Sequence, residues 1–238
     1  MAMKIMVINP NSSLEMTNHI RRVLEQIKSE DTELYVTCPE GGPLAIENAY
    51  DEAMCQPGVL ALVARANREK YDAVLLACFS DPGLEAARVI SDIPVLGIGE
   101  ISMHVAAMMG ERFTVLTMTS KRVAAKEAEV WHFKLRDSAA PVRPLGMSVA
   151  EIEADEQRAR RQILRVAEEA AREDGAEVIV LGCAGMAGYA EGIREKLGLE
   201  VIDPTSVALK VTEALVKAGV RHSKAGLYAR PQNTGCTV

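Results

Sequence analysis

Two cysteines, Cys78 and Cys183, stand at matching places in two similar stretches of the chain. Each follows a short apolar run, residues 73–77 in the first case and 178–182 in the second, and each precedes residues rich in Gly or Pro. Such runs predict buried parallel strands that end at a thiol and turn toward a helix. Because ligands of open α/β sheets bind at the carboxyl ends of strands, we expect the two thiols to serve one active site built from two halves.

Two equivalent thiols on opposite sides of a cleft could invert a stereocentre. One thiolate would take a proton from carbon while the other thiol gives a proton to the opposite face, without metal or organic cofactor. A helix N-terminus favours the reactive thiolate, so we expect Asp81 or Ser80 to cap a helix that begins at Pro82. A single strand-end cysteine is more often structural, and the two-base hypothesis therefore depends on the pairing of Cys78 with Cys183.

The spacing of elements indicates that the chain contains an internal repeat. Cys78 follows Asn9 by 69 positions, and Cys183 follows Thr117 by 66. Asn9 and Thr117 each begin a polar turn after a predicted strand. The predicted strands are residues 4–8, 73–77 and 93–97 in the first half and residues 113–116, 178–182 and 199–203 in the second.

The segments between these strands predict helices, so both sheets should be parallel. The expected helices are residues 12–28, opened by a capping box at Ser12, residues 56–70, residues 148–175, opened by a capping box at Ser148, and residues 206–217, stopped by Gly219. Residues 227–238 show no periodicity and predict a tail or a lid. We expect a first α/β half of residues 1–98 plus 208–238 and a second of residues 99–207.

Composition narrows the class of protein. The chain has 238 residues, of which 48% are hydrophobic and 25% charged, enough for an ordinary globular core. Its net charge of −6 argues against a nucleic-acid or membrane partner, since both need a clustered basic surface. Five scattered cysteines without paired metal-ligand spacing predict a reduced, cytoplasmic protein without structural zinc.

Three segments together resemble the Asp/Glu/hydantoin racemase superfamily, and in particular its hydantoin/allantoin racemase branch. They are residues 7–13, residues 77–84 around Cys78 and residues 180–186 around Cys183. Shorter matches are residues 46–47, 113–117 and 201–203, so that the resemblance covers essentially the whole chain. The two cysteine segments are specific when they occur together.

The resemblance implies two Rossmann-like halves related by a pseudo-twofold, with the active site between them. It implies a homo-oligomeric, cofactor-independent racemase of 5-substituted hydantoins, including allantoin, in which Cys78 and Cys183 are the two acid/bases. The residues that would hold the substrate ring are Asn9, Ser13, Phe79, Ser80, Thr117, Thr119, Ala184 and Gly185. Phe79, Ser80, Ala184 and Gly185 would act through their backbone amides. Many relatives have Gly where this chain has Ser80. The serine side chain either narrows the space beside Cys78 or offers a hydroxyl group to it.

Other polar residues near the expected cleft have weaker claims to function. Glu47 and Asp51 could line the entrance, although exposed carboxylates are common there. Glu100 and His104 share a helix face, and a structural role is favoured for His104. The cysteines outside the repeated setting are interpreted as structural or incidental: Cys38, Cys55 and Cys236. Asp203 could brace Thr205 or a turn, and the methionines of residues 101–110 are assigned to the core or to a subunit interface.

Alternatives to the racemase share the same fold class. A maleate isomerase also uses two cysteines, one of which adds to the double bond, whereas an arylmalonate decarboxylase keeps only one. A silent small-molecule binding module would retain the cleft without turnover, but the presence of both thiols argues against it. A disulfide between Cys78 and Cys183 would mark an inhibited state.

Overall fold

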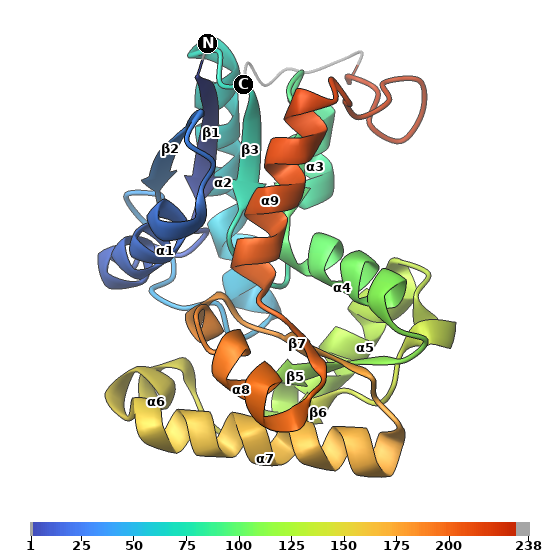
Figure 1. Cartoon of the computed structure of the whole chain (residues 1–238). Helices are drawn as coiled ribbons and strands as arrows, with labels where there is room; N and C mark the ends of the chain where they lie inside the picture. Colours follow the sequence, from blue (N-terminus) through green and yellow to red (C-terminus); the bar gives the residue numbers. More distant parts are fainter. Residues whose placement is uncertain (1, 232–238) are drawn as a thin grey trace. The chain divides into compact units, whose positions relative to one another are not determined.

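The computed structural model describes residues 2–231, apart from the side chains of residues 150 and 153. It divides into two compact units: unit 1 holds the described parts of residues 1–98 and 208–238, and unit 2 holds residues 99–207. Each unit has one parallel sheet of four strands flanked by helices (Figure 1). The expected α/β class, with two similar parallel-sheet halves, is confirmed.

Unit 1 has the strand order β2-β1-β3-β4. Its strands are β1 (Met3–Ile8), β2 (Thr32–Thr37), β3 (Ala73–Leu76) and β4 (Val95–Gly97). Its helices are α1 (Leu14–Ile27), α2 (Ala49–Arg68), α3 (Leu84–Ile90) and most of α9 (Pro204–Lys217). The edge strand β2 was not predicted, because polar residues interrupt its short apolar stretch.

Two helices of unit 1 begin at other residues than predicted. The α1 cap is Ser13, whose hydroxyl accepts a hydrogen bond from the Met16 amide, whereas Ser12 donates to the Gly42 carbonyl oxygen. Helix α2 begins at Ala49, after the cap Asn48, instead of at residue 56. The error in α2 has a clear origin, since Pro57 lies inside the helix, where its missing N–H usually ends one.

Unit 2 repeats the connectivity of unit 1 with the order β6-β5-β7-β8. Its strands are β5 (Phe113–Thr117), β6 (Arg143–Pro144), β7 (Val178–Leu181) and β8 (Glu200–Ile202). Its helices are α5 (Val123–His132), α6 (Val149–Ala154), α7 (Glu156–Asp174), α8 (Ala190–Leu197) and nearly all of α4 (Ile98–Met109). The first strand of each unit is central and pairs with the third, which agrees with the predicted repeat.

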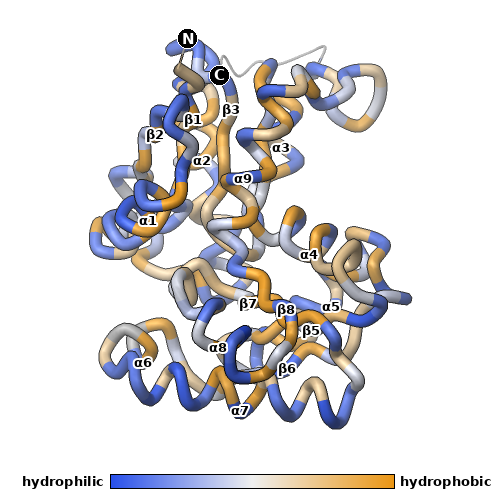
Figure 2. The backbone as a smooth tube through the Cα atoms, viewed as in Figure 1, coloured by the Kyte–Doolittle hydropathy of each residue, from blue (hydrophilic) through white to orange (hydrophobic). Residues whose placement is uncertain are grey.

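The helix predicted over residues 148–175 is in fact two helices. The Ser148 capping box is present, but α6 ends at Ala154 and the side chain of Asp155 caps α7 by accepting from the Arg158 amide. Helix α7 alternates buried apolar and charged residues and ends at Gly175 in the left-handed conformation. Figure 2 shows this alternation along α7. No helix of the described chain is long and apolar enough to span a membrane.

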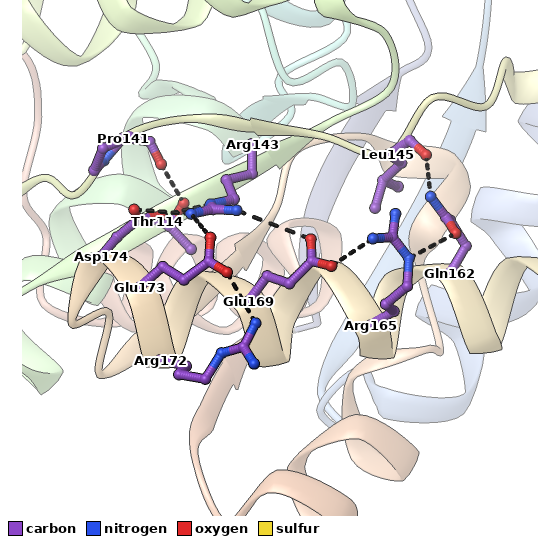
Figure 3. A network of polar contacts seen from close by, with 10 residues as sticks. All are labelled: Thr114, Pro141, Arg143, Leu145, Gln162, Arg165, Glu169, Arg172, Glu173 and Asp174. Carbon is purple, nitrogen blue, oxygen red and sulfur yellow. Dashed lines mark hydrogen bonds and ion pairs between the residues drawn. The ribbon is translucent and has the colours of Figure 1, made fainter.

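The short edge strand β6 is fastened to the end of α7 by Arg143 (Figure 3). The Arg143 Nε donates to Asp174 Oδ2 at 2.6 Å, and its Nη2 donates to Glu173 Oε2 at 2.8 Å. These carboxylates lie at the negative end of the helix dipole, where they need a cation. Their hydrogen bonds raise the pKa of Arg143 and so keep it charged. These ion pairs attach β6, which has only two residues, to the end of α7.

The described part of the C-terminal segment packs on the side of unit 1. The guanidinium of Arg88, on α3, donates to the Tyr228 hydroxyl at 3.2 Å and lies over its ring. The His222 Nε2 lies 3.1 Å from the Val95 amide nitrogen, at the amino end of the edge strand β4. Residues 227–231 are therefore neither a free tail nor a lid at the carboxyl ends of the strands, and residues 232–238, including Cys236, lie outside the described residues.

Candidate active site

Cys78 lies at the carboxyl end of β3. The Ala77 amide continues the strand ladder by donating to the Ile8 carbonyl oxygen at 2.8 Å, and half-buried Cys78 follows directly. The chain then turns, with the Asp81 amide donating to the Cys78 carbonyl oxygen at 2.9 Å. The thiol therefore stands where the parallel strands of unit 1 end, as expected.

The predicted helix cap after Cys78 is wrong. Helix α3 begins at Leu84, and its cap is Gly83 in the left-handed conformation, without a side-chain cap bond. Asp81 also has a positive φ of 45°, and its carboxyl group packs on Gly97, where an added Cβ would lie 2.2 Å from the Asp81 Cγ. The turn is thus shaped by packing against β4, and α3 begins at Leu84 instead of at Pro82.

Ser80 supplies the thiol with a polar neighbour instead. Its hydroxyl oxygen lies 3.6 Å from the Cys78 Sγ, within hydrogen-bonding range for sulfur. A hydroxyl can donate to a thiolate and so favour the charged form. Of the two effects expected of Ser80, the structure shows the hydroxyl contact. Phe79 is 3% exposed, so its side chain belongs to the core and only its backbone could bind a ligand.

The β1–α1 turn holds Asn9 and Ser13 in structural roles. Buried Asn9 uses its Nδ2 to donate to Asn11 Oδ1 at 2.7 Å and to Thr17 Oγ1 at 2.9 Å. Because an amide nitrogen has two hydrogens, Asn9 could offer a ligand only its carbonyl oxygen. The Ser13 hydroxyl accepts from the helix and keeps its hydrogen for a further acceptor.

Cys55, for which the sequence predicts a structural or incidental role, lies near Cys78. It occupies the buried face of α2 at 2% exposure, and its Sγ donates to the Glu52 carbonyl oxygen at 3.2 Å. Burial, followed by the negative charge of Cys78, raises the pKa of Cys55 to about 12. Cys55 is therefore a neutral thiol at physiological pH. No sequence signal links it to Cys78, because the proximity comes from helix–sheet packing.

Cys183 lies at the carboxyl end of β7 in unit 2. It is half-buried and extended, and it caps the 3-10 turn Ala184–Met186. The Gly185 amide donates to its Sγ at 3.4 Å. A backbone amide aimed at the sulfur favours the thiolate. The thiolate-stabilising turn that was expected after Cys78 is therefore seen after Cys183, where it was not predicted. Ala184 and Gly185 are both buried.

The two cysteines occupy the same position in the two sheets. Leu76 pairs with Ile8 and Leu181 pairs with Leu116, and each cysteine follows two residues after the paired leucine. The intervening residue is Ala77 in unit 1 and Gly182 in unit 2. A Cβ on Gly182 would lie 2.6 Å from the Leu116 carbonyl oxygen, which explains why this position in unit 2 is glycine.

The two threonines predicted to line the second half lie near the end of β5. Thr117 is 1% exposed, and its carbonyl oxygen accepts from the Leu145 amide at 2.8 Å. Thr119 is partly exposed and precedes the 3-10 turn Ser120–Arg122 without a side-chain cap bond. Thr119 therefore has the more accessible side chain of the two.

The other weighed residues have structural partners. Asp203 accepts hydrogen bonds from the amides of Thr205, at 3.1 Å, and Gly188, at 2.7 Å, which confirms the bracing role. The His104 Nδ1 lies 2.8 Å from the Glu100 carbonyl oxygen, as expected of a structural histidine. Asp51 accepts from the Glu47 amide at the start of α2, and Glu47 is exposed.

Possible metal ligands and a hollow elsewhere in unit 1 do not involve the two cysteines. Within residues 2–231, no group of three or more His, Cys, Asp and Glu side chains is placed to hold a metal ion. A hollow of about 410 Å³ lies between α1 and β2 and includes Cys38, but neither Cys78 nor Cys183 lines it.

Comparison with known proteins identifies the family. Residues 5–212 match the Asp/Glu/hydantoin racemase family. The chain belongs to this family. It is 39% identical to the hydantoin racemase of Rhizobium meliloti over 97% of this chain and 95% of that protein, and 36% identical to the hydantoin racemase of Pseudomonas sp. (strain NS671) over 97% and 92%.

Solved structures agree with this membership. The allantoin racemase from Klebsiella pneumoniae matches with a TM-score of 0.94 and 34% identity, covering 100% of this chain and 97% of that one. The maleate isomerase from Pseudomonas putida S16 matches at 15% identity and a TM-score of 0.68, which shows a shared fold alone. This member of the Asp/Glu/hydantoin racemase family is thus a racemase, and the expected enzyme class is confirmed.

Proposed function

We propose that this racemase inverts the C5 stereocentre of 5-substituted hydantoins, a class that includes allantoin, by a two-base mechanism. The observation that carries the proposal is the equivalent register of Cys78 and Cys183 at the ends of β3 and β7. The hydantoin and allantoin racemases that match nearly the whole chain support the substrate class.

The proposed reaction begins with one thiolate and one thiol on opposite faces of the substrate carbon. The thiolate takes the C5 proton, and the electron pair of the C–H bond moves into the adjacent carbonyl to give an enolate-like anion. The opposite thiol then gives its proton to C5, leaving the inverted product. The two sulfurs have exchanged protonation states, so the enzyme is ready for the other enantiomer.

The remaining residues would orient the ring and stabilise the charge that develops on its oxygen. We assign the backbone amides of Phe79, Ser80 and Ala184 to the ring carbonyl oxygens. The Gly185 amide was expected to do the same, but its bond to the Cys183 sulfur supports a role in holding that thiolate.

The polar residues at the ends of β1 and β5 would complete the ring contacts. Asn9 Oδ1 would accept from a ring N–H, and the Ser13 and Thr119 hydroxyls would donate to ring oxygens. Thr117, which is buried, would form part of the wall of the substrate pocket. We also propose that the protein is cytoplasmic and homo-oligomeric.

Isotope exchange tests this mechanism. In deuterated water, the product of one turnover should carry deuterium at C5 while unreacted substrate keeps its hydrogen. Cys78→Ala and Cys183→Ala should each reduce racemisation at least a thousandfold, but each should still exchange the C5 proton of one enantiomer, and the two variants should act on opposite enantiomers. Cys38→Ala is the matched control and should racemise normally.

Full racemisation by either single variant would overturn the two-base mechanism. A protein that leaves hydantoins unchanged but forms a covalent adduct with maleate, detected by mass spectrometry, would instead be a maleate isomerase. A ligand-stabilised protein with no isotope exchange across a panel of hydantoins would contradict the proposed substrate class.

A further inference from the structure

The outer face of helix α2 is apolar although it is exposed. Exposed positions run along one face of the helix at Tyr50, Ala53, Met54, Pro57 and Ala61. Tyr50 is 72% exposed and Met54 is 51% exposed. A surface helix normally carries charged residues on its outer face, as α7 does. A contiguous exposed apolar face of this kind marks an interaction site.

The opposite face of α2 already forms the core of unit 1. Cys55, Val59, Val63 and Ala66 are each at most 2% exposed. The helix therefore has apolar residues on both its buried and its exposed side, and for this reason it is only weakly amphipathic. Packing within unit 1 accounts for the buried side, whereas the stripe from Tyr50 to Ala61 requires a second explanation.

The positions of the stripe are symmetric about Pro57 in the sequence. Met54 and Leu60 lie three positions on either side, Ala53 and Ala61 lie four, and Tyr50 and Ala64 lie seven. Leu60 and Ala64 are half-buried at the edge of the stripe, and Leu60 also packs against the core of unit 1. Spacings of three, four and seven keep residues on one helix face. If two copies of α2 pack antiparallel about a twofold axis at Pro57, each residue meets its counterpart, and the large Tyr50 side chain meets a small Ala64.

The charges at the two ends also match in the antiparallel arrangement. Exposed Arg68 lies eleven positions after Pro57, and exposed Glu47 lies ten positions before it. The first turn of α2 adds Asp51 and Glu52. At the other end, Arg65 pairs with Glu69 at 2.7 Å, so the excess positive charge there comes from Arg68 and Lys70. A twofold axis therefore brings the acidic end of one helix to the basic end of the other, whereas a parallel pair would bring like charges together.

We propose that the outer face of α2, from Tyr50 to Ala64, is the surface through which a second copy of this chain binds, as an antiparallel helix pair. The contact is isologous, because the same patch serves both copies. This inference rests on the proposed homo-oligomeric state and names the surface that builds it.

Light scattering after size-exclusion chromatography tests the surface on the full chain. The wild-type protein should be a dimer or a larger assembly at micromolar concentration. Met54→Glu and Tyr50→Asp, both on exposed positions, should raise the dissociation constant at least tenfold and lower the assembled mass, while the thermal unfolding midpoint of the separated species stays near that of wild type. Leu227→Glu in the C-terminal segment, where Leu227 is 74% exposed, is the matched control and should assemble normally.

A cross-link tests the position of the axis. Pro57→Cys should form a disulfide-linked dimer on oxidation with oxygen and a copper catalyst, and peptide mass spectrometry should place the link between the two introduced cysteines. A monomeric wild-type protein would overturn both the assembly and the surface. An assembly that resists Met54→Glu, or that Leu227→Glu disrupts equally, would overturn the α2 surface and leave the assembly standing.

Discussion

The Cys78 sulfur and the Ser80 hydroxyl oxygen lie 3.6 Å apart, whereas the equivalent Cys183 sulfur accepts a hydrogen bond from the backbone amide of Gly185 at 3.4 Å. The two thiols thus occupy the same place in two similar sheets but have different hydrogen-bond donors. One donor is a side chain that can be removed by substitution, and the other is part of the main chain. The acidity of Cys78 can therefore be changed without altering Cys183.

We predict that Ser80→Ala makes Cys78 a weaker acid. A hydrogen bond to a charged group contributes about 1.5–3 kcal/mol, so losing it should move the pH midpoint of Cys78 alkylation upward by about one unit. The measurement is the rate of iodoacetamide modification of each cysteine against pH, followed by peptide mass spectrometry. Cys183 provides the internal control, and Ser80→Thr should restore the wild-type midpoint. An unchanged Cys78 midpoint would show that Ser80 only fills space.

Cys55 should resist alkylation in the folded protein. Its pKa of about 12 and its burial leave almost no thiolate at pH 8, in contrast to the half-buried Cys78 and Cys183. We expect labelling of Cys55 to be at least a hundredfold slower than labelling of Cys78, and to reach the same rate in denaturant. Cys55→Ala should keep racemase activity, since a neutral buried thiol cannot act as a base. Loss of activity in a folded Cys55→Ala variant would contradict this assignment.

Gly182→Ala should destabilise unit 2. The added Cβ would lie 2.6 Å from the Leu116 carbonyl oxygen, and a backbone atom between two paired strands cannot move aside. Overpacking of this kind costs about 1–3 kcal/mol, so the urea unfolding midpoint should fall. Gly41→Ala is the matched control, because nothing lies within 4 Å of its added Cβ and its backbone is not in the left-handed region. An equal midpoint for both variants would show that the strands can separate at Gly182.

The central strands and the ends at which the cysteines stand could be predicted from the sequence because their signal is local. Residues of β3 and β7 are almost completely buried, so each strand is a short unbroken apolar run. The repeat then placed Cys78 and Cys183 in equivalent settings. The two-residue strand β6 has no such signal, since its position depends on the contacts of Arg143 with α7.

The turn after Cys78 could not be predicted, because its cause lies in another strand. Ser80, Asp81 and Pro82 are typical of a helix start, yet Asp81 instead adopts a positive φ and packs on Gly97 of β4. The proximity of Cys55 to Cys78 was missed for a related reason. It depends on which face of α2 meets the sheet, and Pro57 concealed the true start of that helix.

Glu213 should make the stability of unit 1 depend on pH. This carboxylate, on α9, accepts hydrogen bonds from the Ser29 amide at 2.8 Å, the Ser29 hydroxyl at 2.7 Å and the Lys210 ammonium at 3.0 Å. Burial opposes ionisation, but these bonds outweigh it and hold the pKa of Glu213 below its usual range. A pKa that is lower in the folded state means that the stabilisation is complete above the unfolded-state pKa and is lost as pH falls through the folded-state pKa.

We therefore predict that Glu213→Gln lowers the free energy of unfolding by about 1–3 kcal/mol at pH 7, and that the difference from wild type shrinks steadily below about pH 4. Urea titrations of both proteins across this pH range provide the measurement. Glu25→Gln is the matched control, because Glu25 is 44% exposed in its side chain and lies 3.9 Å from Lys28, and it should change stability little at any pH. A Glu213→Gln deficit that stayed constant from pH 7 to pH 3 would show that the carboxylate acts through packing and not through its charge.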